Sequence, residues 1–284
     1  MNYRHAFHAG NFADVVKHAA LTLVLERMRA KPAPFVYVDT HAGAARYDLE
    51  SDPAQRTGEA RDGILRLIED RQAPAVLRPY FDLVRSLNAP GAPILRYPGS
   101  PWIARKLLRR QDRLLLCETH PEIVYELRRA NAGDKRITIR SSDGWAVLKS
   151  DLPPPERRGV VLIDPPFEAK DEFERLARGL RHAYRRFATG ILMAWYPIKT
   201  RRPVDDLHAA VAAAGLRRVT IAELLIRAAA QESDESPRLA GCGLMIVNPP
   251  WMLVETLAEL LPWLAGILAQ GPGAAARLET LVGE

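Results

Sequence analysis

The stretch Val160-Val161-Leu162-Ile163-Asp164-Pro165-Pro166-Phe167 decides how the rest of the chain is interpreted. Its apolar half has the length and the β-branched content of a buried parallel strand. Proline lacks the N–H that a central strand needs, so Pro165 and Pro166 end this strand. Asp164 is therefore expected where a strand opens into a loop, at the sheet edge where α/β proteins bind ligands.

The residues that follow the strand suit a planar base with an exocyclic amine. The carboxylate of Asp164 and the carbonyl of Pro165 each accept an N–H, and the ring of Phe167 stacks on a base. Two such bonds would orient an otherwise conjugated amine lone pair toward an electrophile. We predict Asp164 as the catalytic acceptor; the alternative is a strand end with a Pro-Pro turn and a packed Phe.

Composition limits the class of protein. The chain has 284 residues and a formal charge of +6, which favours an anionic partner, with nucleic acid first. Cys117 and Cys242 lie in apolar runs and are expected to be buried thiols in a reducing compartment, not a disulfide or a metal site. The start lacks an apolar signal core, and glutamates and a proline interrupt the longest apolar stretch, 251–268. We expect a cytoplasmic protein without a membrane partner.

Strand-like and helix-like segments alternate along most of the chain. This alternation predicts a Rossmann-like fold, a doubly wound and mostly parallel seven-stranded sheet. The Gly/Ala-rich end from residue 270 is expected to be mobile or a short helix. The expected strands are residues 35–38, 113–118, 137–139, 160–163, 189–196, 219–225 and 243–247, and the main helices are 13–29, 102–110, 121–130, 171–186, 204–214 and a segment ending near 269.

Residues 47–96 break this alternation. They contain two expected helices, 58–71 and 73–87, surrounded by turn-rich pieces, with no clear strand before residue 94. We predict a helical insertion at 47–96 in a sheet domain made of 1–46 and 97–284. An ordinary long crossover is the alternative.

Four acids lie at or just after the ends of predicted strands: Asp39, Glu118, Asp143 and Asp164. Parallel strands would bring them to one edge of the sheet, whereas each acid alone would be explained as a helix N-cap. A carboxylate that grips a ribose diol usually follows the glycine turn by ~20 residues. Gly43 and Glu118 are 75 residues apart, and removing the 50-residue insertion leaves 25.

The ligand expected at this edge is S-adenosylmethionine. Residues 39–45 contain a single glycine, which disfavours a dinucleotide, and the acids disfavour an exposed phosphate. S-adenosylmethionine has no phosphate and carries a sulfonium, a diol and an adenine. Asp143, beside Gly144, would accept from the adenine amine, and Thr40, His41 and Ser100 would serve the methionine end. Ser100, followed by Pro101, is equally explained as an N-cap.

A second segment, Asn248-Pro249-Pro250-Trp251, offers nearly the same groups as the Asp164 segment. Chain order separates them, because Asp164 follows the acids of the expected cofactor crevice. Asn248 ends a late strand, which is commonly an antiparallel edge in sheets of this type. We therefore favour Asp164 and keep Asn248 as the rival.

The chain resembles, nearly end to end, the RlmJ family of 23S ribosomal RNA adenine-N6 methyltransferases. The segments that carry the resemblance are Tyr3-Arg4-His5-Ala6-Phe7-His8-Ala9-Gly10-Asn11, Ala13-Asp14-Val15 with Lys17-His18, Asp39-Thr40-His41-Ala42-Gly43-Ala44, Tyr97-Pro98-Gly99-Ser100-Pro101, Asp164-Pro165-Pro166-Phe167, Trp195-Tyr196-Pro197 and Asn248-Pro249-Pro250-Trp251. One departure is Phe167, where the family often has Tyr.

The resemblance implies a Rossmann-like methyltransferase domain with a small helical insertion and S-adenosylmethionine as methyl donor, without a metal. It implies Asp164 as the catalytic residue and Tyr3, Pro165, Phe167 and, as a lesser candidate, Lys17 at the substrate adenine. Its cofactor contacts would be His18, His41, Ser100, Glu118, Asp143 and Gly144. The partner would be 23S ribosomal RNA, bound by a monomer. The alternatives are a DNA adenine-N6 methyltransferase and a non-catalytic RNA-binding protein.

Overall fold

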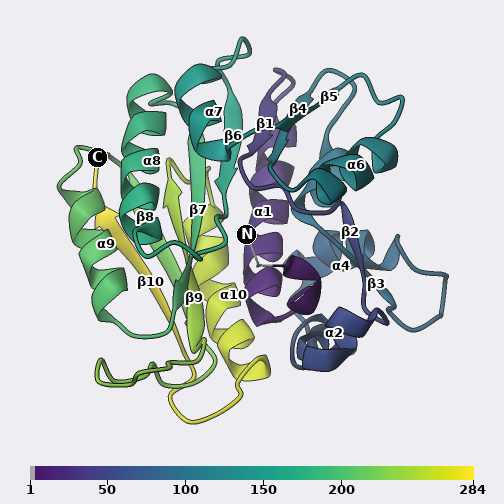
Figure 1. Ribbon diagram of the computed structural model, residues 1–284, viewed down its shortest axis with the longest axis vertical. Helices are drawn as coiled ribbons and strands as arrows, with labels where there is room; N and C mark the ends of the chain where they lie inside the picture. The colour runs from purple at the N-terminus through teal and green to yellow at the C-terminus, as the bar shows by residue number, and fades with distance from the viewer. Residues whose placement is uncertain (1–3) are drawn as a thin grey trace.

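The computed structural model describes residues 4–284 and places one large sheet at the centre of the molecule (Figure 1). Within these residues the sheet has eight strands in the order β10-β8-β9-β7-β6-β1-β4-β5. The strands are β1 (Val36–Asp39), β4 (Arg113–Glu118), β5 (Ile137–Ser141), β6 (Gly159–Ile163), β7 (Ile191–Ile198), β8 (Val219–Leu225), β9 (Gly241–Val247) and β10 (Ala275–Val282). β6 lies between β1 and β7 and is parallel to both.

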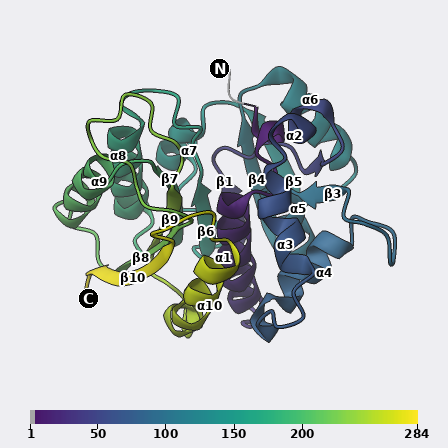
Figure 2. The same ribbon diagram turned by 90° about the horizontal axis from the view of Figure 1, so that it is seen from below.

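Helices cover both faces of this sheet (Figure 2). One face packs against α1 (Phe12–Arg29), α5 (Ser100–Leu107), α6 (Pro121–Ala130) and α10 (Leu253–Ile267). The other packs against α7 (Gly144–Ser150), α8 (Glu172–Arg186) and α9 (Arg202–Ala212). The predicted Rossmann-like α/β fold is therefore confirmed, although the sheet has eight strands among the described residues instead of the expected seven. β6 is buried along its whole length because both of its faces are covered.

The end of the chain differs from the prediction. Residues 275–282 form β10, an edge strand that pairs antiparallel with β8, instead of a mobile end or a helix. This strand was missed because most of its side chains are exposed, so it lacks an apolar face. β9 is antiparallel to its neighbours, as expected, but it pairs with both β7 and β8 and is therefore not an edge strand.

This topology places the rival segment away from Asp164. β9 runs opposite to β7, and Val247 pairs with Leu192 at the start of β7. Asn248 therefore follows at the sheet edge opposite to Asp164. Its Nδ2 donates to the carbonyls of Ala188 and Gly190, at 2.8 Å each, and its φ is +53°. Asn248 thus has a structural role as a clamp on the turn before β7.

The segment 47–96 is flanked by two short strands that pair with each other, β2 (Arg46–Asp48) and β3 (Arg96–Pro98). Between them lie α2 (Asp52–Thr57), the 3-10 turn η2 (Glu59–Asp62), α3 (Ile64–Ile68), the 3-10 turn η3 (Ala75–Leu77) and α4 (Arg78–Arg85). Their apolar side chains join the core cluster that contains α1. The boundaries of an insertion at 47–96 stay a prediction.

The single helix expected at 58–71 is broken at Gly63. The backbone N–H of Ile64 donates to the carbonyl of Gly10, at 2.9 Å. A Cβ on Gly63 would lie 2.1 Å from that carbonyl oxygen, so only glycine allows the approach. The break therefore ties the 47–96 segment to the start of the chain. The helix expected at 73–87 forms within that range, as η3 followed directly by α4.

Replacing Asn248 by Ala is expected to lower the free energy of unfolding by about 1–3 kcal/mol, because two carbonyls lose their donor and alanine disfavours a positive φ. Urea unfolding measures this change. Asn248→Gly should lose less, since glycine accepts the backbone conformation. Wild-type stability of the Ala variant would contradict the proposed clamp.

Candidate active site

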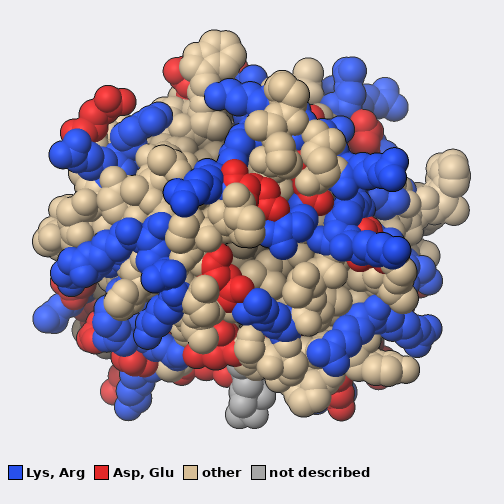
Figure 3. All heavy atoms as spheres, turned by 90° about the horizontal axis from the view of Figure 1, so that it is seen from above, with Lys and Arg blue, Asp and Glu red and all other residues tan. Residues whose placement is uncertain are grey.

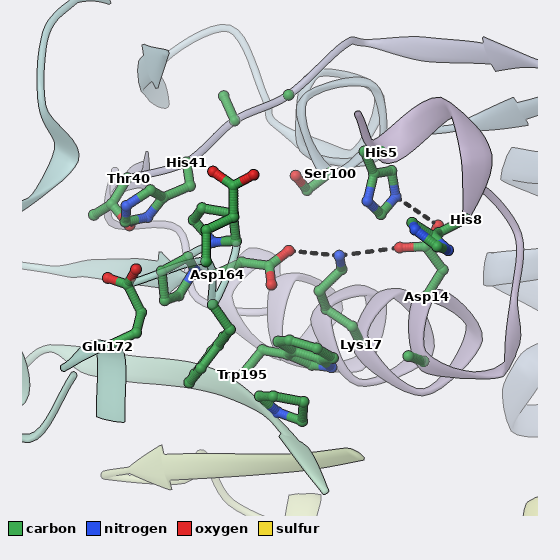
Figure 4. Close-up of a pocket in the computed structure, with 18 of the residues that line it drawn as sticks. His5, His8, Asp14, Lys17, Thr40, His41, Ser100, Asp164, Glu172 and Trp195 are labelled. Atoms are coloured by element: carbon green, nitrogen blue, oxygen red, sulfur yellow. Dashed lines mark hydrogen bonds and ion pairs between the residues drawn. The ribbon is translucent and has the colours of Figure 1, made fainter. Parts of the chain in front are cut away.

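A cavity of about 740 Å³ lies at the carboxyl ends of the parallel strands. The ten described residues predicted for the site all line it: Lys17, His18, His41, Ser100, Glu118, Asp143, Gly144, Asp164, Pro165 and Phe167. Figure 4 shows residues of the N-terminal segment, the β1 end and the β6 end facing one another across this cavity. Tyr3, the remaining predicted residue, lies outside the described residues.

Lys17 connects helix α1 to the end of β6. Its Nζ lies 2.6 Å from Oδ2 of Asp164 and 3.0 Å from Oδ1 of Asp14 (Figure 4). The ammonium group is almost completely buried, with 6% of the side chain exposed. A buried ammonium is stable only when it is paired, so these contacts fix Asp164 relative to α1. The sequence predicted Lys17 as a substrate contact, and the structure also pairs it with the predicted catalytic acid.

Asp14 is the fixed point on the other side of Lys17. It is fully buried, and its Oδ2 accepts from the ring Nε2 of His5 and from the backbone N–H of Gly10, both at 2.9 Å. Burial alone would raise the pKa of Asp14, but the neighbouring His5 and Lys17 hold it well below its usual range. The carboxylate therefore stays charged and anchors both the lysine and the N-terminal segment.

Asp39 and Ser100 form a buried pair beneath the cavity. The hydroxyls of Ser100 and Tyr37 both donate to Oδ2 of Asp39, at 2.7 Å each. Burial raises the pKa of Asp39 to about 6. Gly99, and not Ser100, is the N-cap residue of α5, so the predicted capping role of Ser100 is wrong. Its hydroxyl binds Asp39 instead of a free helix N–H.

Glu118 and Asp143 approach the cavity from β4 and β5. Glu118 accepts from three backbone N–H groups, those of Gly43, Thr119 and His120, at 2.7–3.0 Å. Asp143 caps α7 by accepting from the N–H of Trp145, so the capping explanation holds for this acid while its side chain also lines the cavity. Both carboxylates are thus held rigidly at the edge of the sheet.

Gly144 and Thr40 form a close backbone contact in the floor of the cavity. A Cβ on Gly144 would lie 1.8 Å from the carbonyl oxygen of Thr40, so no other residue fits. The hydroxyl of Thr40 donates to the carbonyl of Leu162 and accepts from Nδ1 of His41. Burial lowers the pKa of His41 to about 4, which keeps its imidazole neutral.

Aromatic rings form one wall of the cavity. Phe167 has a φ of +50°, a strained conformation for an aromatic residue, and its ring meets Trp195 and Phe173 edge to face. The centroids of Phe167 and Trp195 are 5.7 Å apart. Nε1 of Trp195 is buried without a hydrogen-bond partner among the described residues. The surrounding structure must impose this backbone strain, and strained residues of this kind are typical of functional sites.

Sequence reasoning missed three contributors to the cavity. Trp195 lies on a strand and looks like an ordinary core residue, although its segment was part of the family resemblance. Glu172, at the start of α8, is 3% exposed, and burial raises its pKa. The contact of Lys17 with Asp164 joins residues 147 apart, a pairing for which no local pattern exists.

Two further searches cover the described residues 4–284. They contain no cluster of three or more His, Cys, Asp or Glu side chains arranged to hold a metal ion. None of their helices has the length and apolar character needed to cross a membrane.

The sheet order, with the acids at or just after the ends of β4, β5 and β6 lining one cavity, defines a Rossmann-like methyltransferase fold of the S-adenosylmethionine-dependent kind. The chain belongs to the family described as ribosomal RNA large subunit methyltransferase D, RlmJ, whose model matches residues 32–281. The family predicted from the sequence is therefore confirmed.

Individual relatives agree with this assignment. The chain is 43% identical to ribosomal RNA large subunit methyltransferase J of Escherichia coli, over 93% of this chain and 92% of the relative. It is 40% identical to the protein of the same name from Haemophilus influenzae, over 96% of both chains. The crystal structure of LPL1258 from Legionella pneumophila superimposes with a TM-score of 0.86 at 32% identity, covering 96% of this chain and 98% of that one.

The contact between His8 and Glu59 is expected to make stability depend on pH. Nδ1 of His8 lies 3.0 Å from Oε1 of Glu59, and this hydrogen bond raises the pKa of His8 above 6.5. Its contribution is fully present below pH 6.5 and is lost as the pH rises through the raised pKa. The stability difference between wild type and His8→Gln, measured by urea unfolding, should therefore shrink from pH 6 to pH 8.5. Glu59→Gln should behave like His8→Gln, and an unchanged difference across this range would contradict the interpretation.

Proposed function

We propose that this protein transfers a methyl group from S-adenosylmethionine to the exocyclic N6 amine of an adenine in 23S ribosomal RNA. The observation that carries the proposal is the meeting of Asp164 and Phe167 with Glu118 and Asp143 in one cavity. Asp164 and Phe167 suit the target adenine and its amine. Glu118 and Asp143 suit the nucleoside of the methyl donor. Membership of the RlmJ family supports the same reaction.

The residues of the cavity fit the donor. Acids predominate among the charged groups that line the cavity, although one of them, Glu172, is paired through its Oε1 with Arg175, at 3.3 Å. Such a site suits a cationic ligand without phosphate. Glu118 would hold the ribose diol, Asp143 and Gly144 the adenine, and His18, His41 and Ser100 the methionine part. S-adenosylmethionine, when bound, supplies an electrophilic methyl group on a sulfonium.

Asp164 would hold and orient the target amine. Lys17 occupies its Oδ2, and Oδ1 has no hydrogen-bond partner among the described residues. Oδ1 would accept one N–H of the amine, and the carbonyl of Pro165 would accept the other. This arrangement positions the nitrogen lone pair, and the carboxylate stabilises the positive charge that develops on the amine. Methyl transfer makes the amine strongly acidic, so it releases its proton to solvent water after the new N–C bond has formed, and Asp164 does not need to act as a strong base.

Aromatic contacts would hold the base. Phe167 offers a ring face, and the ring of Trp195 stands beside it. An adenine reaches such a cavity only when it is unstacked from its helix or comes from a single strand. Tyr3 and Lys17 are proposed as further contacts of the substrate adenine, and the monomer as the active form.

The nucleic-acid partner would be held largely by basic side chains. Lysines and arginines are spread over the face seen from above, interleaved with acids (Figure 3). Phosphate contacts of this kind give an affinity that falls steeply with salt. A DNA adenine methyltransferase shares the chemistry of Asp164, and methyl incorporation into rRNA but not into DNA of the same sequence would distinguish the two. The residues 47–96 provide little room for reading a DNA duplex.

Asp164→Asn is expected to lower methyl incorporation into 23S rRNA by about 100-fold or more, because the amide cannot stabilise the developing charge. Binding of S-adenosylhomocysteine, measured by calorimetry, should change little. Asn248→Ala is the matched control, and it should retain activity per folded molecule. Near-wild-type turnover of Asp164→Asn would contradict the proposed role, and no incorporation into any nucleic acid by the wild type would contradict the proposed reaction.

A further inference from the structure

We propose that Tyr97, backed by Tyr80, fixes His18 in the tautomer that carries its proton on Nε2. His18 then acts as a permanent hydrogen-bond donor to the carboxylate of the donor's methionine part. This inference rests on the proposed function, since it assumes that the cavity binds S-adenosylmethionine. Tyr97 and Tyr80 are thereby positioning residues, acting on the ligand through His18.

The three side chains form a buried chain of hydrogen bonds. Nδ1 of His18 lies 2.8 Å from the hydroxyl of Tyr97, which lies 2.8 Å from the hydroxyl of Tyr80. None of the three residues is more than 1% exposed. Tyr80 lies on α4 in the 47–96 segment, and Tyr97 on β3 at its end. The chain therefore runs from this segment to the cavity, which only His18 of the three lines.

The direction of the protons follows from counting donors. If Tyr80 donates to Tyr97 and Tyr97 donates to Nδ1 of His18, both hydroxyl protons are satisfied. In the reverse direction the proton of Tyr80 has no acceptor among the described residues, and a buried orphan donor costs about 1–3 kcal/mol. The reverse direction also turns the Nε2 lone pair of His18 toward Oδ1 of Asp14, 3.9 Å away. Both effects favour the tautomer with the proton on Nε2.

His18 is neutral in this environment, so the choice between tautomers matters. Burial lowers the pKa of its imidazole to about 3. The positive charge of Lys17 acts in the same direction, while Asp14 opposes it. A neutral imidazole donates through one nitrogen only. The bond to Tyr97 therefore decides whether Nε2 is a donor or an acceptor.

Three other donors on this side of the cavity are already engaged. The hydroxyl of Ser100 donates to Asp39, and that of Thr40 donates to Leu162. The ammonium of Lys17 lies between two carboxylates. Nε2 of His18 has no partner within hydrogen-bond distance among the described residues. It is thus a neutral donor still available to an anionic carboxylate near α1, whereas Glu118 and Asp143 serve the nucleoside.

The test compares two ligands on Tyr97→Phe, which keeps the ring and removes the donor. S-adenosylhomocysteine carries the carboxylate, and 5′-methylthioadenosine has the same nucleoside and sulfur without it. Tyr97→Phe is expected to weaken S-adenosylhomocysteine about tenfold and 5′-methylthioadenosine less than twofold. Tyr196→Phe is the matched control, because it removes the buried hydrogen bonds of the Tyr196 hydroxyl with Glu223 and His208 on the other face of the sheet. It should affect neither ligand.

The tautomer is read directly by ¹⁵N NMR of the histidine rings, with His18→Gln to assign the signal. The wild type should show His18 protonated at Nε2, a result that does not depend on the folding of Tyr97→Phe. Protonation at Nδ1, or equal weakening of both ligands by Tyr97→Phe, would overturn the inference. Failure of the wild type to bind S-adenosylhomocysteine would instead overturn the proposed function as well.

Discussion

The ion pair that Lys17 makes with Asp14 and Asp164 holds the site together. It joins the first helix to the end of the central strand. Lys17 and Asp14 are nearly excluded from water, whereas 18% of the Asp164 side chain is exposed toward the cavity. Removing one member of such a buried set leaves an uncompensated charge, at a cost of about 3–5 kcal/mol. The position of Asp164, and of the Pro165 carbonyl that follows it, therefore depends on α1 as much as on β6.

The sheet explains why this contact forms where it does. β6 lies between β1 and β7, so its end opens between the acid of β1 and the aromatic wall of β7. α1 packs on the same face as α5, and this places its first turns over the ends of β1 and β6. The N-terminal segment is fixed in turn by the bonds of Asp14 to His5 and Gly10. The sheet, α1 and the N-terminal segment therefore hold the side chains of the site in place. The site is preorganised before any ligand binds.

The sequence was sufficient to predict the parts of the fold that have a local pattern. Buried strands such as β6 are continuous apolar runs, and acids after them mark the sheet edge that holds Glu118 and Asp164. β10 carries mostly exposed side chains and owes its conformation to pairing with β8. Its sequence therefore lacks the alternation of apolar and polar residues that predicts a strand. The break at Gly63 arises from a contact with Gly10, 53 residues earlier in the chain. Trp195 lies in an apolar strand and could not be told from an ordinary core residue. Lys17 and Asp164 are far apart in the sequence, so no local pattern predicts their contact.

The coupling between Lys17 and Asp164 is tested most directly by a double-mutant cycle on the single-turnover rate of methyl transfer. The rates of Lys17→Met, Asp164→Asn and the double variant are compared with saturating donor, after urea unfolding has shown that each is folded. If Lys17 acts through Asp164, the double variant should be no slower than the slower single variant. Losses that multiply in the double variant would show that the two residues act independently, and would contradict the role assigned to their contact.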